Sequence, residues 1–215
     1  MKERGMIFNG EMVRALLSGR KTQTRRHIKW KQTRFTEIGE LEDGSKWPWS
    51  EDAEHACDFW HPCPFGAVGD RIWVRETWAR YNIDQNCHDI AYRATTPADW
   101  PEEGRWRPSI HMPRWASRIL LEITDVRVER VNAISPEDAE SEGLERTNFT
   151  GFGDEPGLPS YPEPDVYFDP LKKQWKEYPP EAFAGLWESI YGEGSWQANP
   201  WVWVIEFKRI EGGAA

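Results

Sequence analysis

The chain has 215 residues, of which 39% are hydrophobic and 29% charged, enough for one packed domain with long polar loops. Its formal net charge of −9 argues against a protein that coats duplex nucleic acid through a broad basic surface. Because the sequence has no apolar run of roughly 18 residues and no signal-peptide pattern at its start, we expect a cytoplasmic protein without membrane contact.

The first elements predicted are a short helix and a basic segment. Asn9 is a suitable N-cap for a helix over 10–18, and Gly19 is a suitable residue to end it. Residues 20–34 then carry only basic charges, and 21–28 are expected to be extended or turning. A local basic patch in an acidic protein suits one nucleotide or a short strand better than a long duplex.

The middle of the chain predicts strands around a long polar segment. Residues 30–66 show no clear periodicity, so we interpret them as an insertion or long loop. After a turn at 69–70, the alternation over 71–78 predicts a strand, and 89–94 is a second candidate. Residues 95–108 are expected to form a loop.

The clearest strand pattern covers residues 117–131. Its apolar residues change parity at Thr124 and Asp125, and a bulge or bend there would return them all to one inward face. Ser135 is followed by Pro and two acids, which indicates the start of a short helix ending at Gly143.

The remaining elements are a second polar insertion, a helix and a strand. Residues 145–180 are rich in Gly and Pro, 181–191 form an amphipathic helical pattern, and 200–207 predict a central strand that is apolar on both faces. We therefore expect a single α+β domain over 1–211, in which antiparallel strands close a small barrel flanked by short helices. The insertions at about 30–66 and 145–180 interrupt it.

Four motifs occur in a fixed order along the chain: LLSGRKTQTRR, GDRIWVRETWA, EDAESEG and NPWVWVIEF. Together they resemble the ASCH domain, a relative of the PUA-like barrels. The segment PSIHMPRWASR, taken with VRETW, is similar to a branch of that family encoded by bacteriophages and prophages.

This resemblance implies a pocket for RNA or a modified nucleoside. Some ASCH proteins are amidohydrolases that remove the acetyl group from N4-acetylcytidine, and another has ribonuclease activity. In the amidohydrolases a Lys and a Thr of the GRKTxT segment act with a Glu, and the matching residues here are Lys21, Thr24 and Glu142. The two insertions are longer than in those small enzymes, so the substrate cannot simply be transferred to this chain.

The residue types themselves suit amide hydrolysis. A Thr hydroxyl, or a water that it holds, can attack, a Lys in a dry pocket can act as base, and a Glu can orient that Lys or pass on the proton. Lys21 and Thr24 are three residues apart, which places them on opposite faces of a regular strand. They converge only if the chain turns between them; otherwise Lys21 is a solvated cation and Thr24 an ordinary strand residue.

Further residues are candidates for contacts with substrate or nucleic acid: Arg20, Thr22, Arg25, Arg26, Arg75, Glu76, Trp78, His111 and Arg114. An Arg can hold phosphate and a Trp can stack on a base. The alternative for the strand residues is an ordinary exposed face, and for His111 and Arg114 a structural turn. The 14 tryptophans also have a structural explanation, as core and edge residues.

No cofactor is expected, although a zinc ion is conceivable. Cys57, His61 and Cys63, with Cys87 and His88 downstream, offer enough ligands for one ion, but their spacing matches no standard finger. The odd number of cysteines does not suggest a disulfide framework.

Three functions remain open from the sequence. The first is an ASCH-type hydrolase of a modified nucleoside, or a ribonuclease. The second is a module that binds RNA, single-stranded nucleic acid or a modified base without chemistry, and the third is a metal-stabilised phage accessory factor.

Overall fold

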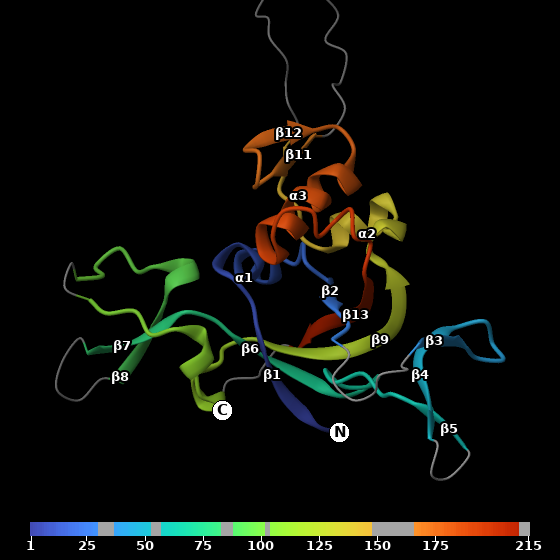
Figure 1. Ribbon diagram of the computed structural model, residues 1–215. Coiled ribbons are helices and arrows are strands. Elements are labelled where there is room, and N and C mark those ends of the chain that lie inside the picture. The colour runs from blue at the N-terminus through green and yellow to red at the C-terminus, as the bar shows by residue number, and fades with distance from the viewer. Residues whose placement is uncertain (30–36, 53–56, 83–87, 102–103, 148–165, 211–215) are drawn as a thin grey trace, which may run out of the picture.

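The computed structural model describes residues 1–29, 37–52, 57–82, 88–101, 104–147 and 166–210. It confirms a mixed α+β fold, in which a central sheet carries three α-helices on its upper side and smaller β-sheets at its periphery (Figure 1). No helix in these ranges is long and apolar enough to cross a membrane.

The central sheet has five strands in the order β1-β6-β9-β13-β2. Their bounds are β1 Glu3–Ile7, β6 Arg71–Arg75, β9 Leu120–Arg130, β13 Trp201–Ile210 and β2 Gln23–His27. β1 runs parallel to β6, and the other neighbours are antiparallel. Within the described ranges β1 and β2 are the edges of an open sheet, so the closed barrel that we expected is not confirmed. A side-chain hydrogen bond, from Arg26 to the Ile7 carbonyl at 2.8 Å, joins the two edge strands.

The bulge predicted in the longest strand pattern is present. Asp125 pairs with Glu206 and Ile123 with Phe207, so Thr124 is an extra residue in β9. Because side chains alternate along a strand, this insertion returns the apolar residues on both sides of it to one core. The prediction from parity is therefore confirmed.

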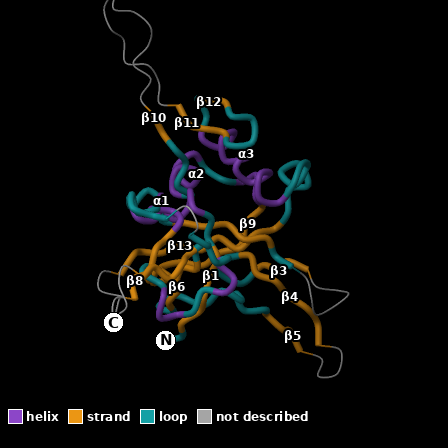
Figure 2. Tube along the Cα trace, turned by 90° about the vertical axis from the view of Figure 1, so that its left-hand side faces the viewer, coloured by secondary structure: helices purple, strands orange, loops and turns teal. Residues whose placement is uncertain are grey.

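Three α-helices pack around the sheet: α1 Gly10–Leu17, α2 Pro136–Ser141 and α3 Pro179–Tyr191. The predicted caps are confirmed, since the Asn9 side chain accepts from Met12 N at 2.8 Å and Ser135 Oγ from Asp138 N at 3.1 Å. Figures 1 and 2 show the three helices on the same side of the molecule, above one end of β2 and β13.

β13 separates two hydrophobic cores, as expected for a central strand. Trp203, Ile205 and Phe207 pack in the core that includes α1, β6 and β9, whereas Val202 and Val204 pack against α2 and α3. A residue of β2 therefore faces one core or the other according to its β13 neighbour.

The two expected insertions contain sheets of their own rather than loop alone. The first holds β3 Glu37–Glu40, β4 Lys46–Asp52 and β5 Cys57–Trp60, and the second holds β12 Gln174–Lys176, β11 Val166–Asp169 and β10 Arg146–Thr147. These antiparallel sheets were missed because their strands are short and lack regular alternation.

The strand expected over 71–78 is in fact broken between β6 and β7. β7 (Trp78–Asn82) leaves the central sheet and pairs with β8 (His88–Tyr92) in a separate lobe, on the left of Figure 1. Four single-turn 3₁₀ helices complete the fold: η1 Arg93–Thr95, η2 Ser109–His111, η3 Arg114–Ala116 and η4 Val131–Ala133.

Candidate functional site

Lys21 and Glu142, which are 121 residues apart in sequence, form a buried ion pair. Lys21 Nζ lies 2.7 Å from Glu142 Oε2, and the exposed fractions of the two side chains are 0% and 3%. The same Nζ donates to the Glu142 carbonyl at 2.8 Å. A charged side chain is rarely buried without a partner, and here Lys21 and Glu142 are each other's partner.

The backbone holds this pair together. Lys21 and Glu142 form an isolated antiparallel bridge just before β2 begins, and Thr22 N donates to the Ser141 carbonyl at 2.9 Å. The next residue, Gly143, has a φ of +89°, and a Cβ there would lie 2.8 Å from Lys21 Cβ. Only glycine suits both the left-handed backbone and this close approach.

Thr24 is brought to the same site because the regular strand starts only at Gln23. Lys21 precedes the strand and reaches Glu142, while Thr24 lies within β2 and lines a small pocket together with Glu142. Its side chain is 1% exposed. Glu142 therefore links the two residues, since it is paired with Lys21 and shares the pocket with Thr24, whereas Lys21 itself does not line the pocket.

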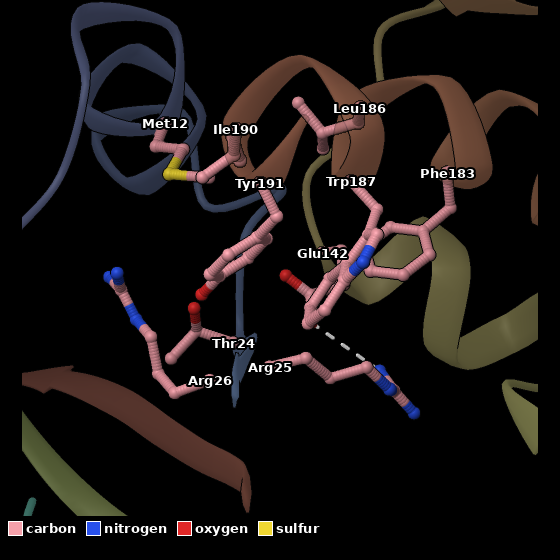
Figure 3. A pocket seen from close by; sticks show the side chains of 10 residues that line it. All are labelled: Met12, Thr24, Arg25, Arg26, Glu142, Phe183, Leu186, Trp187, Ile190 and Tyr191. Atoms are coloured by element: carbon pink, nitrogen blue, oxygen red, sulfur yellow. Dashed lines mark hydrogen bonds and ion pairs between the residues drawn. The ribbon is translucent and has the colours of Figure 1, made fainter. Parts of the chain in front are cut away.

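The pocket lies at the free edge of β2, between α1 and α3 (Figure 3). Its lining residues are Met12 from α1, Thr24, Arg25 and Arg26 from β2, Glu142 after α2, and Phe183, Leu186, Trp187, Ile190 and Tyr191 from α3. Thr24 faces the α1 core beside Ile205, whereas Arg25, beside Val204, faces α3. The cavity volume is about 20 Å³, the space of about one water molecule.

Arg25, a candidate for contact with substrate, lines the pocket and is also the centre of a polar network. Its guanidinium lies 2.8 Å from Asp138 Oδ2, 3.2 Å from Glu129 Oε2 and 3.4 Å from Glu142 Oε1, and its side chain is fully buried. It also donates to Gln23 Oε1. Glu142 therefore has Lys21 on one carboxylate oxygen and Arg25 on the other.

Burial controls the protonation of Lys21. Desolvation lowers the pKa of this ammonium below its ordinary value of 10.5, although the attraction of Glu142 opposes the shift, and Arg26 and Arg25 add to it. Trp187 is 2% exposed and lines the pocket beside Glu142, so α3 contributes to this dry environment. Figure 3 shows Trp187 among the pocket residues, with the Arg25–Glu142 contact drawn as a dashed line.

The other basic candidates of the first motif have different surroundings. Arg26 lines the pocket, with its guanidinium 5.2 Å from the Phe8 ring centre. Arg20 and Thr22 are exposed, and Arg20 donates to Ser18 Oγ at 3.1 Å and to the Leu144 carbonyl at 3.2 Å. Neither Arg20 nor Thr22 lines the pocket.

The remaining candidates for contacts with substrate or nucleic acid lie outside the pocket. None of Arg75, Glu76, Trp78, His111 and Arg114 lines the pocket. Glu76 is buried and paired with Arg118 through two contacts of 2.9 Å, at the break between β6 and β7. Glu76 is therefore a buried partner of Arg118, away from this pocket.

The zinc candidates do not converge within the part of the chain that the structure describes. Cys57 is exposed, Cys63 packs in the α1 core, and His61 shares a 2.8 Å hydrogen bond with Ser50. Burial raises the pKa of the Cys63 thiol to about 11, which disfavours the thiolate that zinc needs. Those ranges hold no group of three His, Cys, Asp or Glu able to bind a metal; Cys87 lies outside the described residues.

The sequence did not reveal the polar network around Arg25 or the aromatic residues of α3 that line the pocket. Gln23 Nε2 donates to both Asp138 and Glu206 at 3.1 Å, and these three residues come from different elements. The amphipathic pattern of α3 predicted its buried face but not that Trp187 and Tyr191 would line a pocket together with Glu142.

Searches of protein-family models, curated proteins and solved structures found no match to this chain. The likeness to the ASCH domain therefore rests on the four motifs, and the family remains a proposal.

Proposed function

We propose that this protein is an ASCH-type hydrolase, with an open PUA-like sheet, that cleaves the exocyclic amide of an N4-acetylcytidine-type nucleoside in the cytoplasm. The observation that carries this proposal is the position of Glu142, which is paired with the buried Lys21 and lines one pocket together with Thr24. A structural ion pair alone does not need a hydroxyl beside it.

The roles follow from the chemistry of each group. The Thr24 hydroxyl, or a water held by it, attacks the acyl carbon while its proton passes to the neutral amine of Lys21. The C–N bond then breaks, and the Lys21–Glu142 pair returns the proton to the leaving amine, giving cytidine. If Thr24 carries the acyl group, water releases it as the carboxylic acid and restores the hydroxyl.

Electrostatics in the pocket support the same scheme. The lowered pKa of Lys21 makes the neutral amine accessible at a smaller cost than for an exposed lysine. Arg26 offers a guanidinium that can stabilise the oxygen of the tetrahedral intermediate. A pocket of about 20 Å³ does not enclose a pyrimidine, so the pocket has to widen when substrate binds, and Tyr191 at the end of α3 is one exposed lining residue that can move.

The test is turnover of N4-acetylcytidine, followed by chromatographic release of cytidine. We expect the wild type to be active and Lys21→Met and Thr24→Val each to lose roughly 10²–10⁴-fold in rate. Lys172→Met, which removes an exposed lysine, is the matched control. The proposal fails if the wild type is inactive, or if both site variants fold and retain full turnover.

A second candidate is a module that binds RNA or a modified base without chemistry. It is favoured by one observation: Lys21 Nζ already has two acceptors within the protein, as a purely structural lysine does. Binding of N4-acetylcytidine without turnover supports this module. Cleavage of an RNA chain in the same incubation supports a ribonuclease instead.

A further inference from the structure

The lobe formed by β7, β8 and the 3₁₀ helices carries two arginine–tryptophan pairs that meet through their indole rings. The guanidinium of Arg80 lies 5.3 Å from the Trp115 ring centre, and that of Arg107 lies 5.3 Å from the Trp78 ring centre. The two indoles meet edge to face, with their centres 5.8 Å apart. We call these four residues, in the order Arg80, Trp115, Trp78 and Arg107, the Arg–Trp ladder.

We propose that the Arg–Trp ladder is a docking surface for single-stranded nucleic acid, separate from the pocket at β2. In this arrangement Arg80 and Arg107 contact phosphates, Trp115 stacks on a base, and Trp78 supports Trp115 from within the lobe. This inference goes beyond hydrolysis of a nucleoside, because it gives the protein a way to hold a polynucleotide.

The charges of the ladder are free to bind an anion. Arg80 and Arg107 are exposed, and within the described ranges neither forms an ion pair with a carboxylate. The nearby carboxylate of Glu76 is buried and neutralised by Arg118. In a protein of net charge −9, two unpaired and stacked guanidinium groups on one surface are complementary to phosphate.

The exposed ring is suited to a base rather than to a protein core. Trp115 is 56% exposed, whereas Trp78 beneath it is 2% exposed. A base can stack on such an indole whatever its sequence, and each guanidinium keeps its charge while lying on a ring. Every nucleotide carries both a phosphate for an arginine and a flat ring for Trp115, whereas an acidic protein segment needs a separate aromatic residue at the right place, so nucleic acid is the better match.

The lobe is attached to the same helix that lines the pocket. Arg14 of α1 donates to the Ala94 carbonyl of η1 at 3.4 Å, and Met12 of α1 lines the pocket. The lobe that carries the ladder therefore contacts the helix that contributes Met12 to the pocket. For the hydrolase this favours a modified residue within a strand as substrate over a free nucleoside, and that consequence rests on the proposed function.

The experiment measures binding of a fluorescein-labelled, 12-nucleotide single strand of mixed sequence by anisotropy across a salt series. We compare Arg80→Ala/Arg107→Ala with Lys172→Ala/Arg209→Ala, which removes the same charge from exposed positions elsewhere. Loss of two phosphate contacts is expected to flatten the slope of log K against log salt by about 1.4 and to weaken binding roughly 10-fold at low salt.

The stacking role is tested separately. Trp115→Ala is expected to weaken binding roughly 5- to 100-fold, whereas Trp115→Phe, which keeps a ring, loses much less. Thermal unfolding shows whether each variant is folded, and RNA and DNA strands of one sequence show which sugar is preferred. Either preference supports the proposal.

Two results overturn the proposal. One is a ladder variant that binds the strand as tightly as the charge-matched control does. The other is a glutamate-rich 12-residue peptide that displaces the strand at equal concentration, which would identify a protein partner. Because none of these variants lies in the pocket, turnover of free N4-acetylcytidine should remain unchanged, so failure of docking and failure of hydrolysis are distinguishable.

Discussion

Asp138 of α2 and Arg25 of β2 lie 2.8 Å apart, between Asp138 Oδ2 and Arg25 Nη2, and this contact joins the candidate site to the outer polar face of the sheet. Arg127 donates to the same oxygen at 2.8 Å, from β9. Asp138 therefore connects two strands that are not neighbours in the sheet, and it contributes to stability in a way that depends on pH.

Asp138→Asn is expected to flatten the acid side of the stability curve. Burial opposes the change, but hydrogen bonds from Arg25 and Gln23 lower the pKa of Asp138 below 3.8 in the folded state. Its contribution is therefore present above the unfolded pKa and lost as pH falls through the lower folded pKa. Urea unfolding between about pH 2 and 5 measures this, and identical slopes for variant and wild type would contradict the assignment.

Glu142→Ala is expected to destabilise the fold by about 3–5 kcal/mol, because it leaves Lys21 without its carboxylate and Arg25 with one fewer. In the double variant Lys21→Met/Glu142→Leu, no unpaired ammonium remains, so part of the loss should be recovered. Urea unfolding at neutral pH compares the two. Equal or greater destabilisation of the double variant would show that the pair is not coupled as we infer.

Lys21→Arg tests whether Lys21 acts as a base or only as a positive charge beside Glu142. A guanidinium keeps the positive charge beside Glu142, but it cannot lose a proton in a protein. We expect turnover to fall by roughly 10²–10⁴-fold while binding of the nucleoside persists. In the wild type, turnover should rise with pH as Lys21 loses its proton, at a pH below 10.5. A fully active Lys21→Arg variant would exclude Lys21 as the base.

Trp187→Leu should move the pH dependence of turnover. Trp187 helps to exclude water from the site, and burial is the largest cause of the lowered pKa of Lys21. Admitting water is expected to raise that pKa toward 10.5, so the rising limb of the profile moves to higher pH. Trp175→Leu, at a 45% exposed position on β12, is the matched control and should leave the profile unchanged.

Local signals predicted the local structure well. The N-caps Asn9 and Ser135, the buried face of α3 and the parity change at Thr124 each depend on neighbours within a few residues, so the sequence contains all that determines them. The same holds for the two-sided burial of β13. The pairing of Lys21 with Glu142 came instead from the resemblance of the motifs.

Contacts between residues far apart in the sequence could not be predicted, because no local pattern determines them. Nothing near Glu3 indicates that β1 would run parallel to β6, since the partner strand follows more than sixty residues later. Likewise, the basic run named Arg25 as a candidate for contact with substrate, but it did not indicate that Asp138 and Glu129 would pair with this arginine. Polar networks of this kind depend on tertiary packing and have no period in sequence.

The place of β13 in the sheet has a consequence for the order of folding. It follows every other described strand in sequence, yet it lies between β9 and β2, and β2 pairs with no other strand in the described sheet. During synthesis β2 is made early, but its partner strand in the described sheet, residues 201–210, is made last. Because such distant pairing is entropically slow, Thr24 reaches its final position among the last steps of folding, and activity should develop together with this strand.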